Sequence, residues 1–255
     1  MSNKKEREKR REERVQQETQ VDSKDRRSRM LQLGAGAVFL VLVAVVVLIV
    51  VSSSGGGSGG DTKLEETANV NKLLNGIPQK AMVVGNAKAP VELIEYGDLQ
   101  CPVCKTYSEE VLPQVIENQV KQGKAKIVFR NFTIIGADSL PAGAATLAAG
   151  EQGRGWTYLE LFYRNQGEEN SGYVTDEFMT SVAEGAGVKN IAKWNEERKS
   201  EKLTEEVETT TEQATNVGFT GTPSFAIKGP STNGTELLSN LSTSAQVEEA
   251  IEKAS

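Results

Sequence analysis

The sequence predicts an α/β fold with an inserted all-helical domain, preceded by one N-terminal transmembrane helix. Three observations predict this architecture. The first is the run of residues 33–51, nineteen positions without a polar side chain. The second is an alternation of strand and helix patterns, in the order β-α-β and, later in the chain, β-β-α. The third is the stretch between them, about 139–216, whose composition favours helices and gives little strand signal, so a sheet interrupted by a helical insertion is expected.

The first thirty residues form a charge-dense tail. They carry eleven Lys or Arg and seven Asp or Glu, and almost no large apolar side chain. This composition predicts a solvated tail that is partly helical through mixed charge pairs. Residues after position 51 carry eighteen basic and twenty-eight acidic side chains, and aromatic residues make up only 5% of the chain. Because nucleic acids are bound by basic surfaces and aromatic stacking platforms, this balance excludes a nucleic-acid-binding protein.

The apolar run has the length of a membrane span. At about 1.5 Å rise per residue it matches the roughly 30 Å hydrocarbon core of a bilayer. Lys and Arg precede it, while Ser and Gly follow it, which predicts a cytoplasmic N-terminus and an extracytoplasmic remainder. The expected parts are a tail (1–30), a transmembrane helix (31–51), a Gly/Ser linker (52–60) and a folded domain (61–255). The alternatives are a cleaved signal peptide, whose apolar part is usually shorter, and a buried core helix.

Before the insertion the pattern predicts a helix, two strands, a helix that begins directly after Cys101 and carries Cys104, and a third strand. In order these elements are 61–74, 82–84, 91–96, 102–122 and 126–132. Asn75, Gly76 and Pro78 end the first helix, and runs of Val and Ile favour the strands. The cysteine-bearing helix is expected to be kinked or interrupted at Pro113, which lacks a backbone donor, and to stop at Gly123.

The insertion and the end of the chain complete the expected fold. Four helices are predicted in the insertion, at 142–149, 155–165, 175–184 and 191–214. The large aromatic residues there are expected in the core rather than around a cofactor: Trp156, Tyr158, Phe162 and Trp194. Strands at 224–228 and 235–238 form a hairpin candidate with Asn233-Gly234 as the turn signal. A last helix at 243–253 is capped by Thr243 or Ser244.

The only two cysteines stand in one C-x-x-C motif, Cys101-Pro102-Val103-Cys104, and the chain has no histidine. Without an imidazole, a Ser-His-Asp triad, a Cys-His nucleophile and a histidine-ligated metal are excluded. The motif opens a predicted helix with Pro102 at its first position, so unpaired backbone N–H groups and the helix dipole favour a thiolate on Cys101. Cys101 is expected to be the exposed, attacking sulfur, and Cys104 the buried thiol that resolves a mixed disulfide.

Two other roles stay open for the cysteine pair. A structural disulfide would close so few residues that it would stabilise the fold only weakly. A zinc site would need further ligands, which only carboxylates could supply. No glycine-rich phosphate loop follows a strand in the required form, so no nucleotide is implied. Thiol–disulfide exchange without a cofactor or metal is therefore the favoured chemistry.

Two motifs of the chain resemble those of DsbA-like thioredoxin-fold proteins. They are GDLQCPVC at 97–104, after a predicted strand, and GTPSF at 221–225, before a late strand. In that family a helical domain separates the two motifs, much as residues 139–216 do here. The likeness covers roughly residues 77–253. It implies a thioredoxin fold and a protein thiol–disulfide oxidoreductase.

The resemblance also implies roles for residues outside the C-x-x-C motif. Pro223 is expected in the cis form opposite the cysteines, where an extended substrate could pair with the backbone of Thr222. An ordinary trans proline that starts a strand is the alternative. The residue before this proline tunes redox behaviour in the family, and here it is Thr222. Members also carry an acidic residue six positions before the first cysteine, which corresponds to Glu95.

Glu95 is also selected by the periodicity of its strand. It shares a face with Leu93, so it is expected to point into the core. A buried carboxylate has a raised pKa and could accept the proton of Cys104. The alternative is a surface charge near the strand end. Lys124 or Lys126 is a candidate basic partner.

Val103 departs from the family pattern and bears on the direction of electron flow. The best-known oxidases of the family have histidine there, whereas valine gives the thiolate no hydrogen bond or charge, so a less acidic Cys101 and a less oxidising disulfide are expected. The expected protein is a membrane-tethered, extracytoplasmic oxidoreductase that forms disulfides in secreted or cell-envelope proteins. The family implies a membrane reoxidase, DsbB- or VKOR-like, as its partner. The alternatives are a reductase or isomerase of the same fold, and a binding module or chaperone without turnover.

Overall fold

The computed structural model of the chain describes residues 64–239 and 241–255. The predicted tail, transmembrane helix and linker lie outside this part of the chain, so they stay predictions. Within the described residues, no helix is both long enough and apolar enough to cross a membrane.

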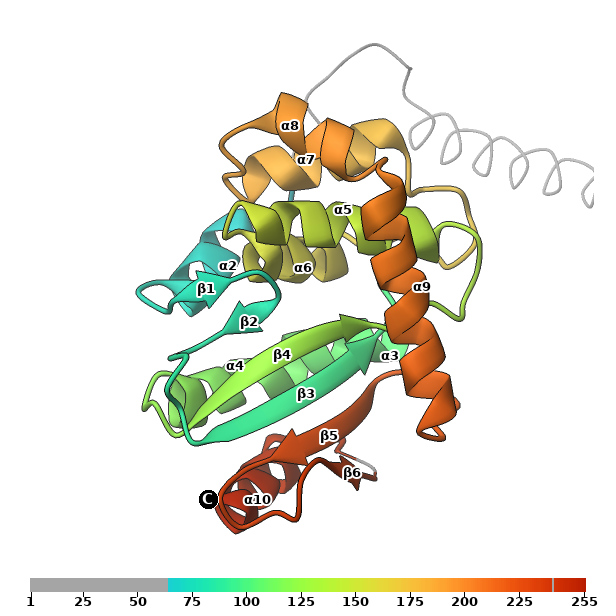
Figure 1. The fold of residues 1–255 in the computed structure, drawn as a ribbon. Helices are drawn as coiled ribbons and strands as arrows, with labels where there is room; N and C mark the ends of the chain where they lie inside the picture. The colour runs from blue at the N-terminus through green and yellow to red at the C-terminus, as the bar shows by residue number, and fades with distance from the viewer. Residues whose placement is uncertain (1–63, 240) are drawn as a thin grey trace, which may run out of the picture. The chain divides into compact units, whose positions relative to one another are not determined.

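A six-stranded mixed sheet runs through the described part of the chain, with strand order β1-β2-β4-β3-β5-β6 (Figure 1). Its strands are β1 (Gln79–Lys80), β2 (Val83–Val84), β3 (Val91–Gly97), β4 (Ala125–Asn131), β5 (Ser224–Lys228) and β6 (Glu236–Leu238). β3 and β4 are parallel, and the other neighbouring pairs are antiparallel. The predicted strands are confirmed to within a residue at each end. β1 was not predicted, because two polar residues carry no periodicity.

The helix predicted at 102–122 is present but irregular. It consists of α3 (Pro102–Thr106), a π-helical turn η1 (Tyr107–Val111), α4 (Leu112–Val115) and a second π-helical turn η2 (Ile116–Val120). Pro113, in α4, has no N–H to give to the preceding turn, and wider turns lie on both sides of it. The interruption expected at Pro113 is thus confirmed as a change of helix type. Gly123, with φ of 71°, follows the helix as predicted.

Five helices fill the described chain between β4 and β5. They are α5 (Ser139–Glu151), α6 (Gly155–Arg164), α7 (Asp176–Gly185), α8 (Ile191–Glu197) and α9 (Glu201–Asn216). The prediction of one helix over 191–214 is wrong. The helix breaks because the Ser200 side chain accepts a hydrogen bond from the N–H of Leu203 at 3.4 Å and so caps a new helix, α9. Figure 1 shows α9 leading from the other helices of this group back to β5.

Two further helices flank the sheet region in sequence. They are α2 (Thr67–Leu74) and α10 (Ser244–Ala254). Of the two candidate caps for the last helix, the structure selects Thr243. Its side chain accepts from the N–H of Gln246, and the Gln246 side chain accepts from the N–H of Thr243 at 3.1 Å, which is a capping box.

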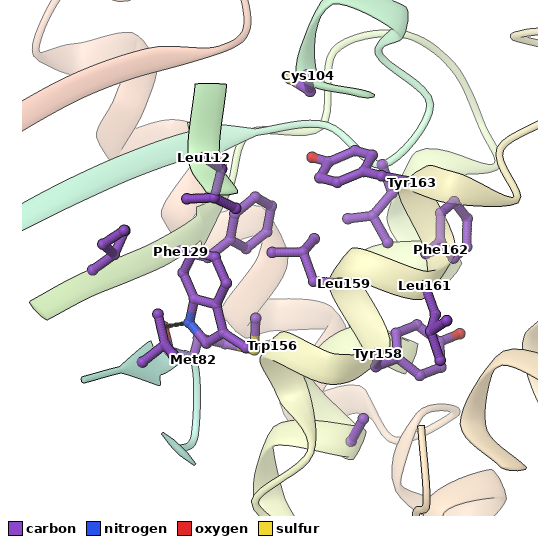
Figure 2. Close-up of a cluster of buried hydrophobic side chains, with 14 of the residues drawn as sticks. Met82, Cys104, Leu112, Phe129, Trp156, Tyr158, Leu159, Leu161, Phe162 and Tyr163 are labelled. Carbon is purple, nitrogen blue, oxygen red and sulfur yellow. Dashed lines mark hydrogen bonds between the residues drawn. The ribbon is translucent and has the colours of Figure 1, made fainter. Parts of the chain in front are cut away.

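The core joins α6 to the sheet and reaches the cysteines (Figure 2). The four aromatic residues predicted for the core are all 0% exposed: Trp156, Tyr158, Phe162 and Trp194. The indole N–H of Trp156 donates to the carbonyl oxygen of Met82 at 2.9 Å, so its one polar atom is satisfied inside the core. Cys104 is 0% exposed and belongs to the same cluster. The inner cysteine is therefore part of the packed interior.

Candidate active site

Cys101 lies where β3 ends and α3 begins. Gly97 closes β3, Cys101 is the N-cap of α3, and Pro102 is the first helical residue. The N–H groups of this first turn have no helical partner, and the helix dipole is positive at this end. Gly97 is required by close packing, because a Cβ there would lie 2.7 Å from the Phe129 ring and 2.9 Å from the Tyr163 hydroxyl.

Asp98 holds the loop that carries Cys101. Its buried carboxylate accepts hydrogen bonds from the N–H groups of Gln100 at 2.9 Å, Ile134 at 2.8 Å and Ile135 at 2.9 Å. The first bond closes an Asx turn, and the other two tie the loop after β4 to the cysteine loop. Asp98 was not among the predicted site residues. An aspartate directly after a strand, two residues before an N–H that it can accept, was the available signal.

The sulfur of Cys101 has two polar neighbours. It accepts a hydrogen bond from the N–H of Cys104 at 3.3 Å, and its thiol donates to the Thr222 carbonyl oxygen at 3.3 Å. Both cysteines are free thiols. The expectation of an exposed Cys101 is wrong, because the residue is only 4% exposed: the Thr222 backbone and the first turn of α3 cover it.

The two thiols differ strongly as acids. A hydrogen bond from the Cys104 side chain is the largest cause that lowers the pKa of Cys101 from 9.0 to about 6. The Thr222 side chain and the N–H groups of Cys104 and Val103 act in the same direction, while burial opposes them. Burial raises the pKa of Cys104 well above its ordinary range, and a neighbouring Cys101 thiolate adds to this. At neutral pH the outer sulfur is thus a thiolate and the inner one keeps its proton.

This difference predicts a titration that can be measured directly. In the reduced protein, the ultraviolet absorbance of a thiolate should appear with a midpoint near pH 6. It should be lost in Cys101→Ser and persist in Cys104→Ser, with a higher midpoint in the latter because the largest stabilising hydrogen bond is removed. A single midpoint at the ordinary cysteine value would contradict the geometry described for Cys101.

The second predicted motif meets the first at the end of β3. The Thr222–Pro223 peptide bond is cis, as predicted. β5 begins directly after it, and Ser224 pairs with Tyr96 near the end of β3. The sheet register therefore brings Thr222 and Pro223 to the cysteine loop, where the Thr222 carbonyl touches Cys101. Their roles in catalysis stay predictions.

Glu95 lies within β3, beside Phe129 of β4 and Phe225 of β5. It is 2% exposed, so its predicted burial is confirmed and a surface charge is excluded. Burial is the main cause that raises its pKa to about 8, and the charges of Glu160 and Cys101 add to the shift. At neutral pH the carboxyl group therefore holds a proton inside the core.

The basic partner expected for Glu95 is not there. Lys126 instead contacts Glu92, with Nζ 3.2 Å from the carboxylate. Glu92 and Glu95 lie on opposite faces of β3, because side chains alternate along a strand. Within the described residues Glu95 forms no ion pair, and its charge raises the pKa of Cys104. Glu95 and Cys104 therefore lie close enough for the charge of one to affect the ionisation of the other.

Residues of the helical insertion also hold the cysteine loop, and they were not predicted from the sequence. The Gln166 amide donates to the carbonyl oxygens of Leu99 at 2.6 Å and Cys101 at 3.2 Å. The Gln100 side chain is buried and donates to Ser139 Oγ at 3.0 Å. Gln100 stands within the GDLQCPVC motif and Gln166 in no motif, and neither role is visible in the sequence, because the partners are backbone atoms or residues far away in the sequence.

Two further observations limit the chemistry of the site. The Val103 side chain, 59% exposed, points its apolar surface to solvent and offers no hydrogen bond to the thiolate. In the part of the chain that the structure describes, no three Cys, Asp or Glu side chains are grouped to hold a metal ion.

Known proteins are similar to this chain in sequence and in fold. Residues 78–253 match the family described as thioredoxin. A protein described as a probable disulfide bond formation protein D, from Bacillus cereus, is 29% identical over 149 residues, which cover 57% of this chain and 69% of that protein. Disulfide bond formation protein D of Bacillus subtilis is 23% identical over 192 residues, which cover 74% and 84% of the two chains.

Solved structures show the same fold. BdbD from Bacillus subtilis, in its oxidised form, matches with a TM-score of 0.61 at 21% identity, over 70% of this chain and 96% of that chain. DsbA from Chlamydia trachomatis matches with a TM-score of 0.54 at 19% identity, over 68% and 90%. The predicted thioredoxin fold is therefore confirmed.

Proposed function

Because this chain belongs to the thioredoxin family and is a protein thiol–disulfide oxidoreductase, we propose that it forms disulfides in secreted or cell-envelope proteins. The observation that carries the proposal is the pair of unequal thiols at the N-terminus of α3, a Cys101 with a pKa of about 6 and a buried Cys104. A stabilised Cys101 thiolate favours the dithiol form of the protein. Its disulfide form is then an oxidant of other thiols.

In the first step a substrate thiolate attacks the sulfur of Cys101 in the Cys101–Cys104 disulfide. A disulfide forms between the substrate and Cys101, the Cys101–Cys104 bond breaks, and Cys104 leaves as a thiolate. Cys104 binds a proton tightly, and Glu95 still holds one near neutral pH. Glu95 would therefore give its proton to Cys104 as the bond breaks.

In the second step another substrate thiolate attacks the substrate sulfur of the mixed disulfide. The substrate disulfide forms, and Cys101 departs as a thiolate, which a thiol of low pKa does readily. The substrate has lost two electrons, and the protein holds them as its dithiol. Turnover then needs an electron acceptor, for which we propose a membrane reoxidase, DsbB- or VKOR-like.

Thr222 and Pro223 would bind the substrate during these steps. The Thr222 backbone lies 3.3 Å from the Cys101 sulfur through its carbonyl oxygen. An extended substrate segment could add to this backbone as a strand, with its cysteine over Cys101. The Thr222 side chain also lowers the pKa of Cys101, which supports the proposed role of this residue in tuning the redox behaviour.

Localisation at the cell membrane is part of the proposal, with residues 1–30 in the cytoplasm, 31–51 in the bilayer and the catalytic domain outside. The apolar run and the basic residues before it support this orientation. The full chain should stay in the membrane fraction after carbonate extraction, and protease added to intact spheroplasts should degrade the catalytic domain. A domain protected from the protease would refute the orientation.

The proposed reaction is tested by trapping its intermediate. Cys104→Ser should accumulate mixed disulfides between Cys101 and envelope proteins, because the thiol that resolves them is gone. Diagonal electrophoresis with and without reductant would detect these adducts. Cys101→Ser/Cys104→Ser is the matched control and should trap nothing. If Cys104→Ser also traps nothing, the proposed reaction with envelope proteins is refuted, and the result favours the alternative of a binding module.

A further inference from the structure

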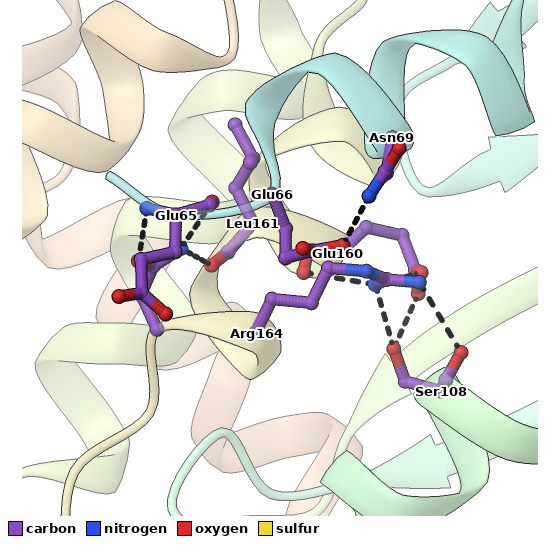
Figure 3. Close-up of polar contacts among 8 residues, drawn as sticks. Glu65, Glu66, Asn69, Ser108, Glu160, Leu161 and Arg164 are labelled. Carbon is purple, nitrogen blue, oxygen red and sulfur yellow. Dashed lines mark hydrogen bonds and ion pairs between the residues drawn. The ribbon is translucent and has the colours of Figure 1, made fainter. Parts of the chain in front are cut away.

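A second carboxylate is buried against the active-site helix, the irregular helix of residues 102–120, and the proposed reaction steps do not use it. Glu160, on α6, is 0% exposed. Its Oε2 lies 2.5 Å from Nη1 of Arg164, and its Oε1 accepts a hydrogen bond from Ser108 Oγ at 3.0 Å (Figure 3). Arg164 also donates to Ser108 Oγ at 3.2 Å. The pair is thus fixed to the active-site helix from the side of the insertion.

The packing leads from this pair to Glu95. Tyr107 and Ser108 follow Cys104 by three and four residues, so they lie one turn further along the same helix. The Tyr107 ring packs on Phe225, with centroids 4.9 Å apart. Phe225 is the register neighbour of Glu95 in the sheet, and directly opposed side chains share a face. Tyr107 therefore lies between the two carboxyl groups: it is next in sequence to Ser108, which binds Glu160, and it packs on the sheet neighbour of Glu95. The charges of both glutamates raise its pKa.

The side chains of Glu95, Tyr107 and Glu160 are all buried, and few polar groups around them can compensate a charge. The Tyr107 hydroxyl is buried and has no hydrogen-bond partner among the described residues. β4 and β5 place only phenylalanine rings beside Glu95. The titratable groups that interact with Glu95 come from the cysteine loop, the helix that follows it and α6: Cys101, Cys104, Tyr107, Glu160 and Tyr163. Asp98 acts on Tyr163, and Arg164 pairs with Glu160. In such surroundings one buried charge acts strongly on another.

We propose that Glu160, held in place by Arg164 and Ser108, acts through Glu95 and makes it keep its proton until Cys104 departs as a thiolate. Glu160 is a positioning residue in this sense: it touches no reacting sulfur but sets the protonation of the group that serves Cys104. The use made of that proton rests on the proposed function. The coupling between the two carboxylates does not.

The test is a titration of the glutamate carboxyl carbons by NMR, in a Cys101→Ser/Cys104→Ser background. The Glu95 signal is assigned by its loss in Glu95→Gln. Glu160→Gln should move the Glu95 midpoint to lower pH by about one unit, a tenfold change in its proton dissociation constant. Two causes act together: a negative charge is removed, and Arg164 is left uncompensated. An unchanged midpoint overturns the proposal.

Arg164→Met is the matched control, because it breaks the same ion pair but removes a positive charge. The number of protons that Glu95 and Glu160 hold together at pH 7 should then rise. If Glu160 and Arg164 only held the fold together, either substitution would instead let water in and move the glutamate titration to lower pH. Shifts to lower pH in both variants overturn the proposal.

If Arg164→Met does not fold, the double variant Glu160→Gln/Arg164→Met keeps the proposal testable. It contains neither charge of the pair, so its Glu95 midpoint should lie above that of Glu160→Gln, where the cation is uncompensated. A midpoint at or below that of Glu160→Gln would indicate hydration of the site and overturn the proposal.

The titration is independent of turnover, since both thiols are absent and no substrate is added. If the two variants shift the titrations in opposite directions but the wild-type protein does not oxidise peptides, the proposed function alone is refuted. If the wild-type protein oxidises peptides but the expected shifts are absent, the coupling alone is refuted.

Discussion

Replacing Cys101 by serine should abolish the oxidation of reduced peptides by this protein. The variant has no sulfur at the position that the substrate attacks and cannot form the Cys101–Cys104 disulfide. A hydroxyl is neither oxidised to a disulfide nor displaced as a thiolate is. The rate should fall by at least about a thousandfold, which corresponds to about 4 kcal/mol of lost transition-state stabilisation. Oxidation of a dithiol peptide, with oxidised glutathione as the electron acceptor, measures it.

The fold of this variant should be intact, because the replacement differs by one atom at the N-cap of α3, and serine is itself a good N-cap. Near-ultraviolet circular dichroism and thermal unfolding would check this. Peptide oxidation that persists in a folded Cys101→Ser protein would show that Cys101 is not the sulfur that the substrate attacks.

Glu95→Gln should make the protein more stable at alkaline pH. The folded-state pKa of Glu95, about 8, lies above its ordinary value of 4.5. Below 4.5 both states are protonated and the carboxyl group carries no penalty. As pH rises from 4.5 to 8, Glu95 ionises only in the unfolded state, so the free energy of unfolding of the wild-type protein falls progressively. The full shift corresponds to on the order of 5 kcal/mol, a cost that an amide avoids because it cannot ionise.

Urea unfolding of both proteins at pH 5 and at pH 8 measures this effect. The stability advantage of Glu95→Gln should be small at the lower pH and large at the higher one. An advantage that does not change with pH would show that Glu95 ionises normally in the folded protein.

The same substitution should slow the reaction at neutral pH. Glutamine cannot give a proton to the departing Cys104, and a positioned general acid typically contributes about a hundredfold or more. The difference should shrink above pH 8, where wild-type Glu95 has lost its proton as well. Rates of peptide oxidation from pH 6 to pH 9 test this. Equal rates at pH 7 would remove Glu95 from the mechanism.

The sequence predicts the reacting groups of this protein well, because their signals are local. Cys101 and Cys104 stand in one motif, and Pro102 marks the helix N-terminus that stabilises the thiolate. Glu95 is found by the period of its strand, since alternation alone assigns it to the buried face. Pro223 is different: only the resemblance to a family predicted its cis bond, which no composition or spacing reveals.

Most of the supporting contacts could not be predicted, because they join residues that are far apart in the sequence. The Asx turn of Asp98 has a local signal, but its bonds to the loop after β4 do not. Gln166 likewise binds backbone atoms that only the fold brings to it. Glu160 lies more than fifty residues from Ser108 and meets it only through α6. The burial of Cys101 likewise depends on Thr222, which is far away in the sequence and lies beside Cys101 only in the folded chain.

The reduction potential of the Cys101–Cys104 pair tests the central claim most directly. The protein is equilibrated with defined ratios of reduced and oxidised glutathione, and the dithiol fraction is measured by thiol alkylation. Because the Cys101 thiolate stabilises the dithiol, the potential should lie nearer to about −120 mV than to about −270 mV, and Val103 should keep it below that of the strongest oxidants. A potential near about −270 mV would contradict the account and identify the chain as a reductant.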